Sequence, residues 1–281
     1  MSAVKSGSTR WALRRGPALL RGGGAVRRRG SLWAPPWQLL AVVALLASGC
    51  GGTFRIHERP IPFSDWRQQA TRAYIAEHYG RQVDSITIEP RIIVLHWTAS
   101  DSLEESLSRF EPEGLPARRA DLGGTGKAGA GQVNVSAHFL VDRDGKIFRL
   151  MPETWMARHV IGLNLSAIGI ENVGGEGGVD NLTRRQIKAN IRLVRDLKAR
   201  FPSIGYLIAH SEYRQLEGHP LWLELDPGYR TEKIDPGERV MKKVRRAVAD
   251  LGLEGVEDVP TEGPIVGRSE GDSRETPSDG I

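Results

Sequence analysis

Two histidines stand directly after apolar runs that are typical of buried strands. His96 follows the run Ile92–Leu95, and His210 follows Tyr206–Ala209. In α/β proteins, sites are built where strands end at the edge of the sheet. A catalytic zinc ion takes three protein ligands and keeps a fourth position open, and two histidines with one carboxylate form a recognised set. The matched placement of the two histidines therefore indicates a candidate zinc site that needs a third ligand.

Five short motifs occur in order along the chain around these histidines. They are His96–Ala99, Ser136–Val141, Ser166–Glu171, Ala209–Ser211 and Lys233–Gly237. Together they resemble the N-acetylmuramoyl-L-alanine amidases of the type-2 zinc family, relatives of peptidoglycan-recognition domains and phage-type amidases. The resemblance covers residues 88–250. It implies zinc on His96, His210 and Asp235, with Glu171 and Lys233 catalytic, and hydrolysis of the amide between N-acetylmuramic acid and L-alanine.

Asp235 has two competing interpretations. It opens the sequence Asp-Pro-Gly-Glu, which suits the start of a helix with Asp as N-cap, Pro at the first helical position and Glu at the third. An earlier Asp-Pro-Gly at Asp226 offers a rival ligand within the long stretch after His210. We favour Asp235 as the ligand because only this aspartate has a lysine, Lys233, two residues before it.

The residue types at the two catalytic positions suit amide hydrolysis. Zinc lowers the pKa of its bound water towards ~7. Glu171 follows the apolar run Ile168–Ile170, where burial would raise the pKa of its carboxyl group and suit it as a general base. Lys233 supplies a fixed positive charge for the oxyanion.

Three further residues are predicted to contact substrate. His138 either lines the groove or makes hydrogen bonds beneath the sheet. His159, close in sequence to Trp155 and Arg158, is similar to the substrate-facing Trp-His segment of the family. Asn164 is predicted to meet the peptide stem.

Apolar periodicity predicts the elements that position these residues. Alternating strands and helices around one core predict a single α/β domain, with a mixed central sheet flanked by helices. Ser102 and Glu105 predict a capping box at the second helix. The predicted strands are 91–97, 137–141, 147–151, 167–173 and 206–209, and the predicted helices are 66–78, 102–110, 183–201 and 237–251.

The N-terminal 49 residues predict a lipoprotein signal peptide. A basic segment precedes the apolar run Leu39–Ala47, and small residues lead to Cys50, the single cysteine of the chain. Such a run is short for a membrane span. We expect cleavage before Cys50 and its acylation, which anchors a protein without spanning the bilayer. Gly51 rather than aspartate follows Cys50, which favours an outer-membrane anchor facing the periplasm.

The remaining boundaries follow from composition. Residues 50–87 are predicted as a tether and a helix, residues 88–251 as the zinc amidase domain, and residues 252–281 as a disordered acidic tail. The net charge of +5 is misleading, because residues 1–49 hold eight basic and no acidic residues, which leaves −3 for residues 50–281. Nucleic-acid binding is therefore not expected. The Gly-rich stretch 123–131 is not a phosphate loop, because Asp121 and Ala128 stand where that motif needs Gly and Ser or Thr.

The leading prediction is a monomeric zinc enzyme acting on peptidoglycan or muropeptides. The main alternative is a peptidoglycan-binding module of the same fold without catalysis, and another is a zinc hydrolase of a different amide. Binding modules of this kind typically lack a metal ligand, whereas this sequence has all three candidates together with Glu171 and Lys233.

Overall fold

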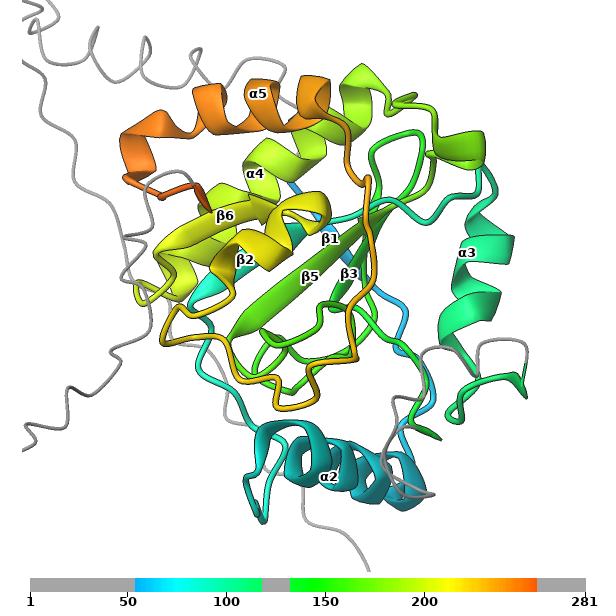
Figure 1. The fold of residues 1–281 in the computed structure, drawn as a ribbon. Coiled ribbons are helices and arrows are strands. Elements are labelled where there is room, and N and C mark those ends of the chain that lie inside the picture. The colour runs from blue at the N-terminus through cyan, green and yellow to red at the C-terminus, as the bar shows by residue number, and fades with distance from the viewer. Residues whose placement is uncertain (1–53, 118–131, 257–281) are drawn as a thin grey trace, which may run out of the picture. The chain divides into compact units, whose positions relative to one another are not determined.

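The computed structural model describes residues 54–117 and 132–256, which belong to one compact unit of the chain. Its centre is a six-stranded sheet in the order β1-β4-β3-β5-β2-β6 (Figure 1). Among the described strands, β3 and β4 alone pair antiparallel, because a short turn ending at Gly145 joins them. Helices cover both faces, so the predicted α/β class is confirmed. The strands are β1 (Ile56–Glu58), β2 (Ile92–Leu95), β3 (Phe139–Val141), β4 (Ile147–Arg149), β5 (Ala167–Asn172) and β6 (Tyr206–Ala209).

Two of the described helices, α3 and α4, begin where capping residues predict them to begin. Thr183 and Gln186 form a reciprocal capping box at the start of α4. The Ser102 hydroxyl accepts a hydrogen bond from the Glu105 N–H at the start of α3, but the Glu105 carboxylate bonds Ser100 and Arg109, so that predicted box is only half formed. The helices are α2 (Asp65–Tyr79), α3 (Leu103–Phe110), α4 (Arg184–Arg200) and α5 (Glu238–Ala247), with short 3₁₀ helices η3 (Glu176–Gly178), η4 (His210–Leu216) and η5 (Ala249–Leu251).

The two faces of the sheet carry separate hydrophobic clusters. Successive side chains of a strand point to opposite faces. Ile93 and Leu95 of β2 therefore pack into the cluster that includes α4 and α5. Ile92 and Val94 pack on the other face, with α2. Figure 1 shows α2 on one side of the sheet and the α4–α5 pair on the other.

The packed domain is longer at both ends than the sequence predicts. The predicted tether contains β1, which pairs with β4 at the edge of the sheet. The predicted tail begins too early, because Glu254 donates its N–H to Gly205 O and Val256 is buried. Both segments are too short to show a periodic apolar pattern. The predicted signal peptide, Cys50, the Gly-rich stretch and the rest of the tail lie outside the described residues. No helix of the described part is long and apolar enough to cross a membrane.

Candidate metal centre and active site

Strand register brings three of the predicted site residues to one edge of the sheet. Leu95 of β2 lies opposite Ile170 of β5 and opposite Ala209 of β6, and all three strands run parallel. The residues that follow these positions are His96, Glu171 and His210. Because parallel strands end at the same edge, their side chains meet there although they lie far apart in sequence.

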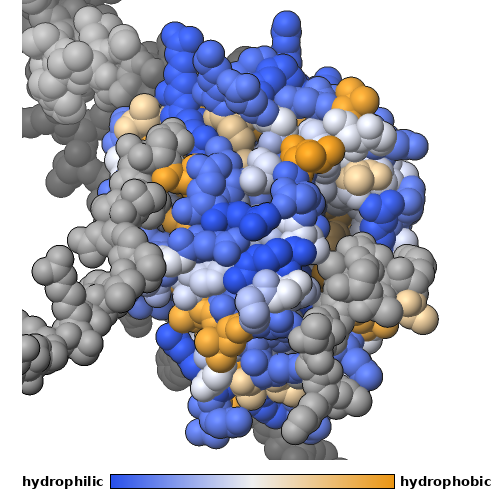
Figure 2. Space-filling view, viewed as in Figure 1, coloured by the Kyte–Doolittle hydropathy of each residue, from blue (hydrophilic) through white to orange (hydrophobic). Residues whose placement is uncertain are grey.

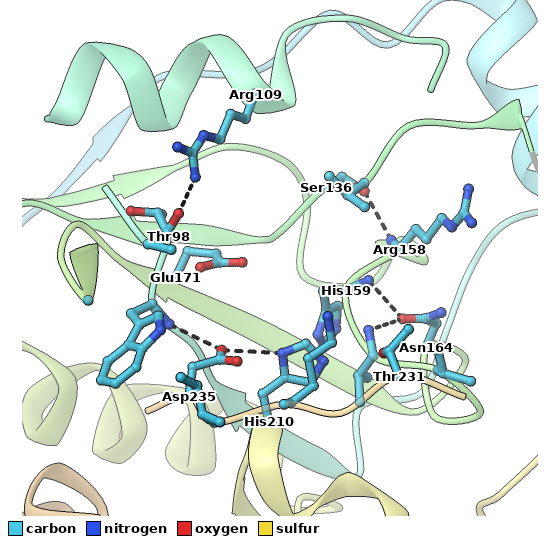
Figure 3. Close-up of a pocket in the computed structure, with 18 of the residues that line it drawn as sticks. Thr98, Arg109, Ser136, Arg158, His159, Asn164, Glu171, His210, Thr231 and Asp235 are labelled. Carbon is cyan, nitrogen blue, oxygen red and sulfur yellow. Dashed lines mark hydrogen bonds and ion pairs between the residues drawn. The ribbon is translucent and has the colours of Figure 1, made fainter. Parts of the chain in front are cut away.

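Asp235 reaches the same edge from the segment between η4 and α5. Its carbonyl accepts a hydrogen bond of 2.8 Å from the Ser211 N–H, and its Oδ2 lies 3.3 Å from the Trp97 N–H. The same oxygen lies 3.2 Å from His210 Nδ1 (Figure 3). It also lies 3.6 Å from His96 Nδ1. One ligand atom from each of His96, His210 and Asp235 lies within 4.8 Å of the others, and all three residues are buried. This cluster has the donor set and spacing to hold a metal ion.

The structure supports neither alternative to Asp235 as a metal ligand. The predicted N-cap role is wrong, because α5 begins at Glu238 with Gly237 as its N-cap. The bonds from Ser211 and Trp97 hold Asp235 away from the helix start. Asp226 lies outside the cluster, and its Oδ1 accepts a hydrogen bond of 2.8 Å from the Gly228 N–H within a turn.

The electrostatics of the cluster favour the protonation states that metal binding needs. Burial, reinforced by His210, lowers the pKa of His96 to about 4, so its ring is neutral near pH 7. Burial alone would raise the pKa of Asp235, but His210 and His96 outweigh it and hold that pKa well below its usual range. A neutral imidazole and a charged carboxylate are the forms that bind metal.

His159 fixes the orientation of His96. Its Nε2 lies 3.2 Å from the carbonyl of Ala167, which can only accept, so Nε2 carries the proton. Burial lowers the pKa of His159 well below its usual range, so the ring is neutral and its Nδ1 accepts from His96 Nε2 at 3.0 Å. His96 Nδ1 is then unprotonated and faces Asp235. The geometry gives His159 a positioning role beside the metal cluster. It also lines the pocket, and its predicted substrate contact stays a prediction.

Gly169 in the motif Ser166–Glu171 makes room for this arrangement. A Cβ at Gly169 would lie 2.7 Å from the ring of His159. The motif therefore needs a glycine two residues before Glu171, because the imidazole packs directly on the backbone of β5.

Removal of the His159 ring is expected to weaken metal binding. In His159→Leu the Nε2–H of His96 loses its acceptor, and loss of such a partner typically weakens metal affinity by about 10- to 100-fold. His159→Asn, which places an oxygen close to the position of Nδ1, should retain most of the affinity. Chelator competition measures the affinity, and ¹⁵N NMR of the metal-free protein reports the His96 tautomer. Equal affinities and an unchanged tautomer in the Leu variant would contradict this role.

Glu171 and Lys233 face the pocket beside the cluster. Burial, followed by the charge of Asp235, raises the pKa of Glu171 to about 8, although Lys233 and Arg109 oppose the increase. Its Oε2 is buried and has no hydrogen-bond partner among the described residues. Figure 3 shows the Glu171 carboxylate directed towards the space between Thr98, Asp235 and His210. A partly buried carboxylate with an unused oxygen and a raised pKa has the properties of a general base.

The pocket has a cavity volume of about 370 Å³ and contains more functional groups than the sequence predicts. Arg109 of α3 lines it, and its guanidinium donates to the carbonyl of Thr98. Arg158 lies deeper and donates to the Tyr229 hydroxyl at 2.9 Å. Sequence could have indicated Arg109, because its helix α3 is the next helix after β2, the strand that precedes His96. Tyr229 lies in a non-periodic stretch, where sequence offers no comparable signal.

Two of the predicted substrate contacts are occupied by interior hydrogen bonds. His138 is fully buried; its Nδ1 accepts from the Gly169 N–H at 3.0 Å, and its Nε2 lies 2.8 Å from the Trp155 carbonyl. Both ring nitrogens are therefore used beneath the sheet, and the alternative of a groove-lining residue is not supported.

Asn164 lines the pocket, but its amide groups hold the loop that carries His159. Its Oδ1 accepts from the N–H groups of His159 and Val160, and its Nδ2 donates to the Tyr79 hydroxyl at 2.9 Å. Asn164 thus links the end of α2 to the metal cluster through His159. This arrangement gives Asn164 a positioning role, and its predicted contact with the peptide stem stays a prediction.

Comparison with known proteins agrees with this geometry. The family model for N-acetylmuramoyl-L-alanine amidase (Amidase_2) matches residues 86–238, which is more than half of the chain. This range includes all three residues of the metal cluster, Glu171 and Lys233. No curated protein matches the chain.

Several solved structures are similar to the chain. The endolysin amidase LysCS from Clostridium intestinale is 20% identical, covering 71% of this chain and 97% of its own, with a TM-score of 0.43. The amidase AmiD from E. coli, in complex with the substrate anhydro-N-acetylmuramic acid-L-Ala-D-gamma-Glu-L-Lys, is 24% identical and covers 58% of this chain and 60% of its own, with a TM-score of 0.34. Human PGRP-IBETAC, in complex with glycosamyl muramyl pentapeptide, is 14% identical and covers 59% and 88%, with a TM-score of 0.39.

Proposed function

The chain belongs to the N-acetylmuramoyl-L-alanine amidase family, and from this premise we propose that it hydrolyses the amide bond between N-acetylmuramic acid and L-alanine in peptidoglycan or muropeptides. The observation that carries this proposal is the convergence of a partly buried carboxylate, Glu171, with His210 and Asp235 in one pocket, where these two residues form a metal cluster with His96. A module that only binds peptidoglycan has no need of a general base beside a metal cluster.

The residues of the cluster fit Zn²⁺, and we propose this ion as the cofactor. Two imidazoles and one carboxylate are a recognised set for catalytic zinc, which prefers tetrahedral sites. His96 Nδ1 and Asp235 Oδ2 are both electron-pair donors, yet they face each other at 3.6 Å. This arrangement is favourable when a cation lies between them. When bound, zinc would acidify water and polarise the amide carbonyl.

The pocket residues supply the proton transfer and the charge stabilisation. Glu171 removes the proton from the attacking water and delivers it to the leaving amine of L-alanine. A cation on the neighbouring cluster favours the charged form of Glu171, which a base requires. Lys233 lines the same pocket and stabilises the oxyanion of the tetrahedral intermediate.

Incubation with a muropeptide digest in the presence of Zn²⁺ tests the proposal. The expected products are free stem peptide and peptide-free sugar, identified by mass spectrometry. Binding of muropeptide without release of peptide would instead support the non-catalytic binding module. Cleavage of unrelated peptides with no muropeptide cleavage would favour a different amide substrate.

We also propose that the mature protein is a lipoprotein anchored through Cys50 and located at the outer membrane, facing the periplasm. The apolar run before Cys50 and the absence of any other cysteine support this proposal. Mass spectrometry of the protein extracted from membranes is expected to find a diacylglyceryl-modified Cys50 at the N-terminus. Cys50→Ser should leave the protein in the soluble fraction or with its signal peptide uncleaved. An unmodified Cys50 in the mature protein would contradict the anchor.

A further inference from the structure

The outer surfaces of α4 and α5 together form a strongly basic face. The two helices contain twelve basic and two acidic residues, a net charge of +10, whereas residues 50–281 as a whole carry −3. The other described residues hold 14 basic and 24 acidic residues, a net charge of −10, so positive charge is concentrated on these two helices. We call this surface the α4–α5 face. Its exposed basic residues without an ion pair in the described part of the chain are Arg184, Arg185, Lys188, Lys242, Lys243 and Arg246.

Helical spacing gathers these charges on the solvent side. Arg184 and Lys188 are one turn apart on α4, and Lys242 and Arg246 are one turn apart on α5. The opposite sides of the same helices are apolar and pack against the sheet. Figure 1 shows α4 and α5 next to each other, and Figure 2 shows that the part of the surface above the sheet is mostly hydrophilic.

The chain enters the domain on the same side of the sheet as this face. Phe54 and Ile56 pack against the hydrophobic cluster that contains α4 and α5. Cys50 precedes Phe54 by four residues, which span roughly 14 Å at most at about 3.5 Å per residue. An acyl chain on Cys50 would therefore hold the bilayer surface within a short distance of Phe54.

The two histidines of the metal cluster follow strand ends, and their side chains are directed to the other face of the sheet. Side chains two and four positions apart on a strand lie on the same face, so His96 is on the face of Ile92 and Val94. Those two side chains pack in the hydrophobic cluster that includes α2. His210 follows the alternation of Ile208 in the same way. A surface that approaches the α4–α5 face would thus lie across the sheet from these two imidazoles.

From this placement we propose that the α4–α5 face docks on the anionic phospholipid surface of the membrane that carries the anchor. Each lysine or arginine near such a surface adds to the attraction, so several together hold the domain in one orientation. In the docked domain, the two imidazoles lie on the face of the sheet away from the membrane. This proposal goes beyond the amidase activity and does not depend on it, but its choice of membrane rests on the Cys50 anchor proposed above.

Vesicle co-sedimentation tests the docking without the acyl group. The protein is the mature chain from residue 50 with Cys50→Ser, which contains every residue of the two hydrophobic clusters. It should bind vesicles that contain phosphatidylglycerol, bind neutral phosphatidylcholine vesicles at least about tenfold more weakly, and be released as salt rises. Equal binding to both kinds of vesicle, or no binding, would overturn the proposal.

Charge reversal on matched positions identifies the face. Lys188→Glu with Lys242→Glu, one change on each helix, should reduce binding by at least about tenfold. Arg72→Glu with Arg81→Glu makes the same charge change on and after α2, and should leave binding close to wild type. Equal loss in both variants would overturn the proposal, because net charge alone would then explain binding. Binding that appears only after removal of residues 257–281 would also overturn it, since the acidic tail would then occupy the face.

Discussion

Glu171→Gln is expected to lower kcat for muropeptide hydrolysis by about 10²- to 10⁴-fold, the usual contribution of a general acid–base group. The substitution removes the proton acceptor but keeps the size and the strand position of the side chain. Zinc affinity should change little, because Glu171 is not part of the His96, His210 and Asp235 cluster. Steady-state kinetics with a defined muropeptide and chelator competition measure these two quantities separately.

Glu232→Gln is the matched control for this experiment. Glu232 also lines the pocket, but its side chain is 85% exposed and pairs with Arg214. Its removal should leave kcat within about twofold of wild type, since surface ion pairs contribute little. Comparable losses in the two variants would show that the pocket needs negative charge in general and would argue against Glu171 as the base.

The same Glu171 substitution should change how the stability of the metal-free protein depends on pH. Burial raises the pKa of Glu171 to about 8 from 4.5, so between these pH values the folded state binds more protons than the unfolded state. The free energy of unfolding of the wild type therefore falls as pH rises through this window. In Glu171→Gln this loss is absent. Thermal unfolding in EDTA should therefore show that the stability of the variant, relative to the wild type, increases from pH 5 towards about 8. Parallel curves would contradict the raised pKa.

Asp235→Asn is expected to have the second large effect, the loss of metal binding. The substitution replaces a charged ligand with a neutral amide and leaves the two imidazoles with no negative partner. We expect zinc affinity to fall by more than about 100-fold, beyond the 10- to 100-fold typical of residues that only orient a ligand. Activity should fall with it and should return only partly when zinc is in excess. Competition with a fluorescent chelator measures the affinity.

Asp226→Asn separates the two aspartates. Asp226 holds a turn through Gly228 and lies outside the metal cluster. Its variant should bind zinc like the wild type, although the loss of a turn hydrogen bond can lower the melting temperature. Wild-type zinc affinity in Asp235→Asn, together with loss in Asp226→Asn, would reverse the assignment.

The sequence alone determined the features that depend on local pattern. Continuous apolar runs placed β2 and β6 and hence the positions of His96 and His210 at strand ends. The apolar stretch before Glu171 correctly predicted a carboxylate whose pKa is raised by burial. Capping residues fixed the start of α4 within one residue. Each of these follows from neighbours within a few positions, where periodicity and hydrogen-bond chemistry are decisive.

The tertiary structure alone decided which residues meet across the chain. Only the docking of the segment after η4 onto Ser211 and Trp97 brings Asp235 into the cluster and leaves Asp226 outside it. Packing also gave His159 and Asn164 their positioning roles. The partner of His159 is His96, directly after β2, and that of Asn164 is Tyr79 of α2. The α4–α5 face could not be predicted from the sequence, because positive and negative charges nearly cancel after residue 49. The sequence gives the number of charges, but only folding decides which of them share a surface.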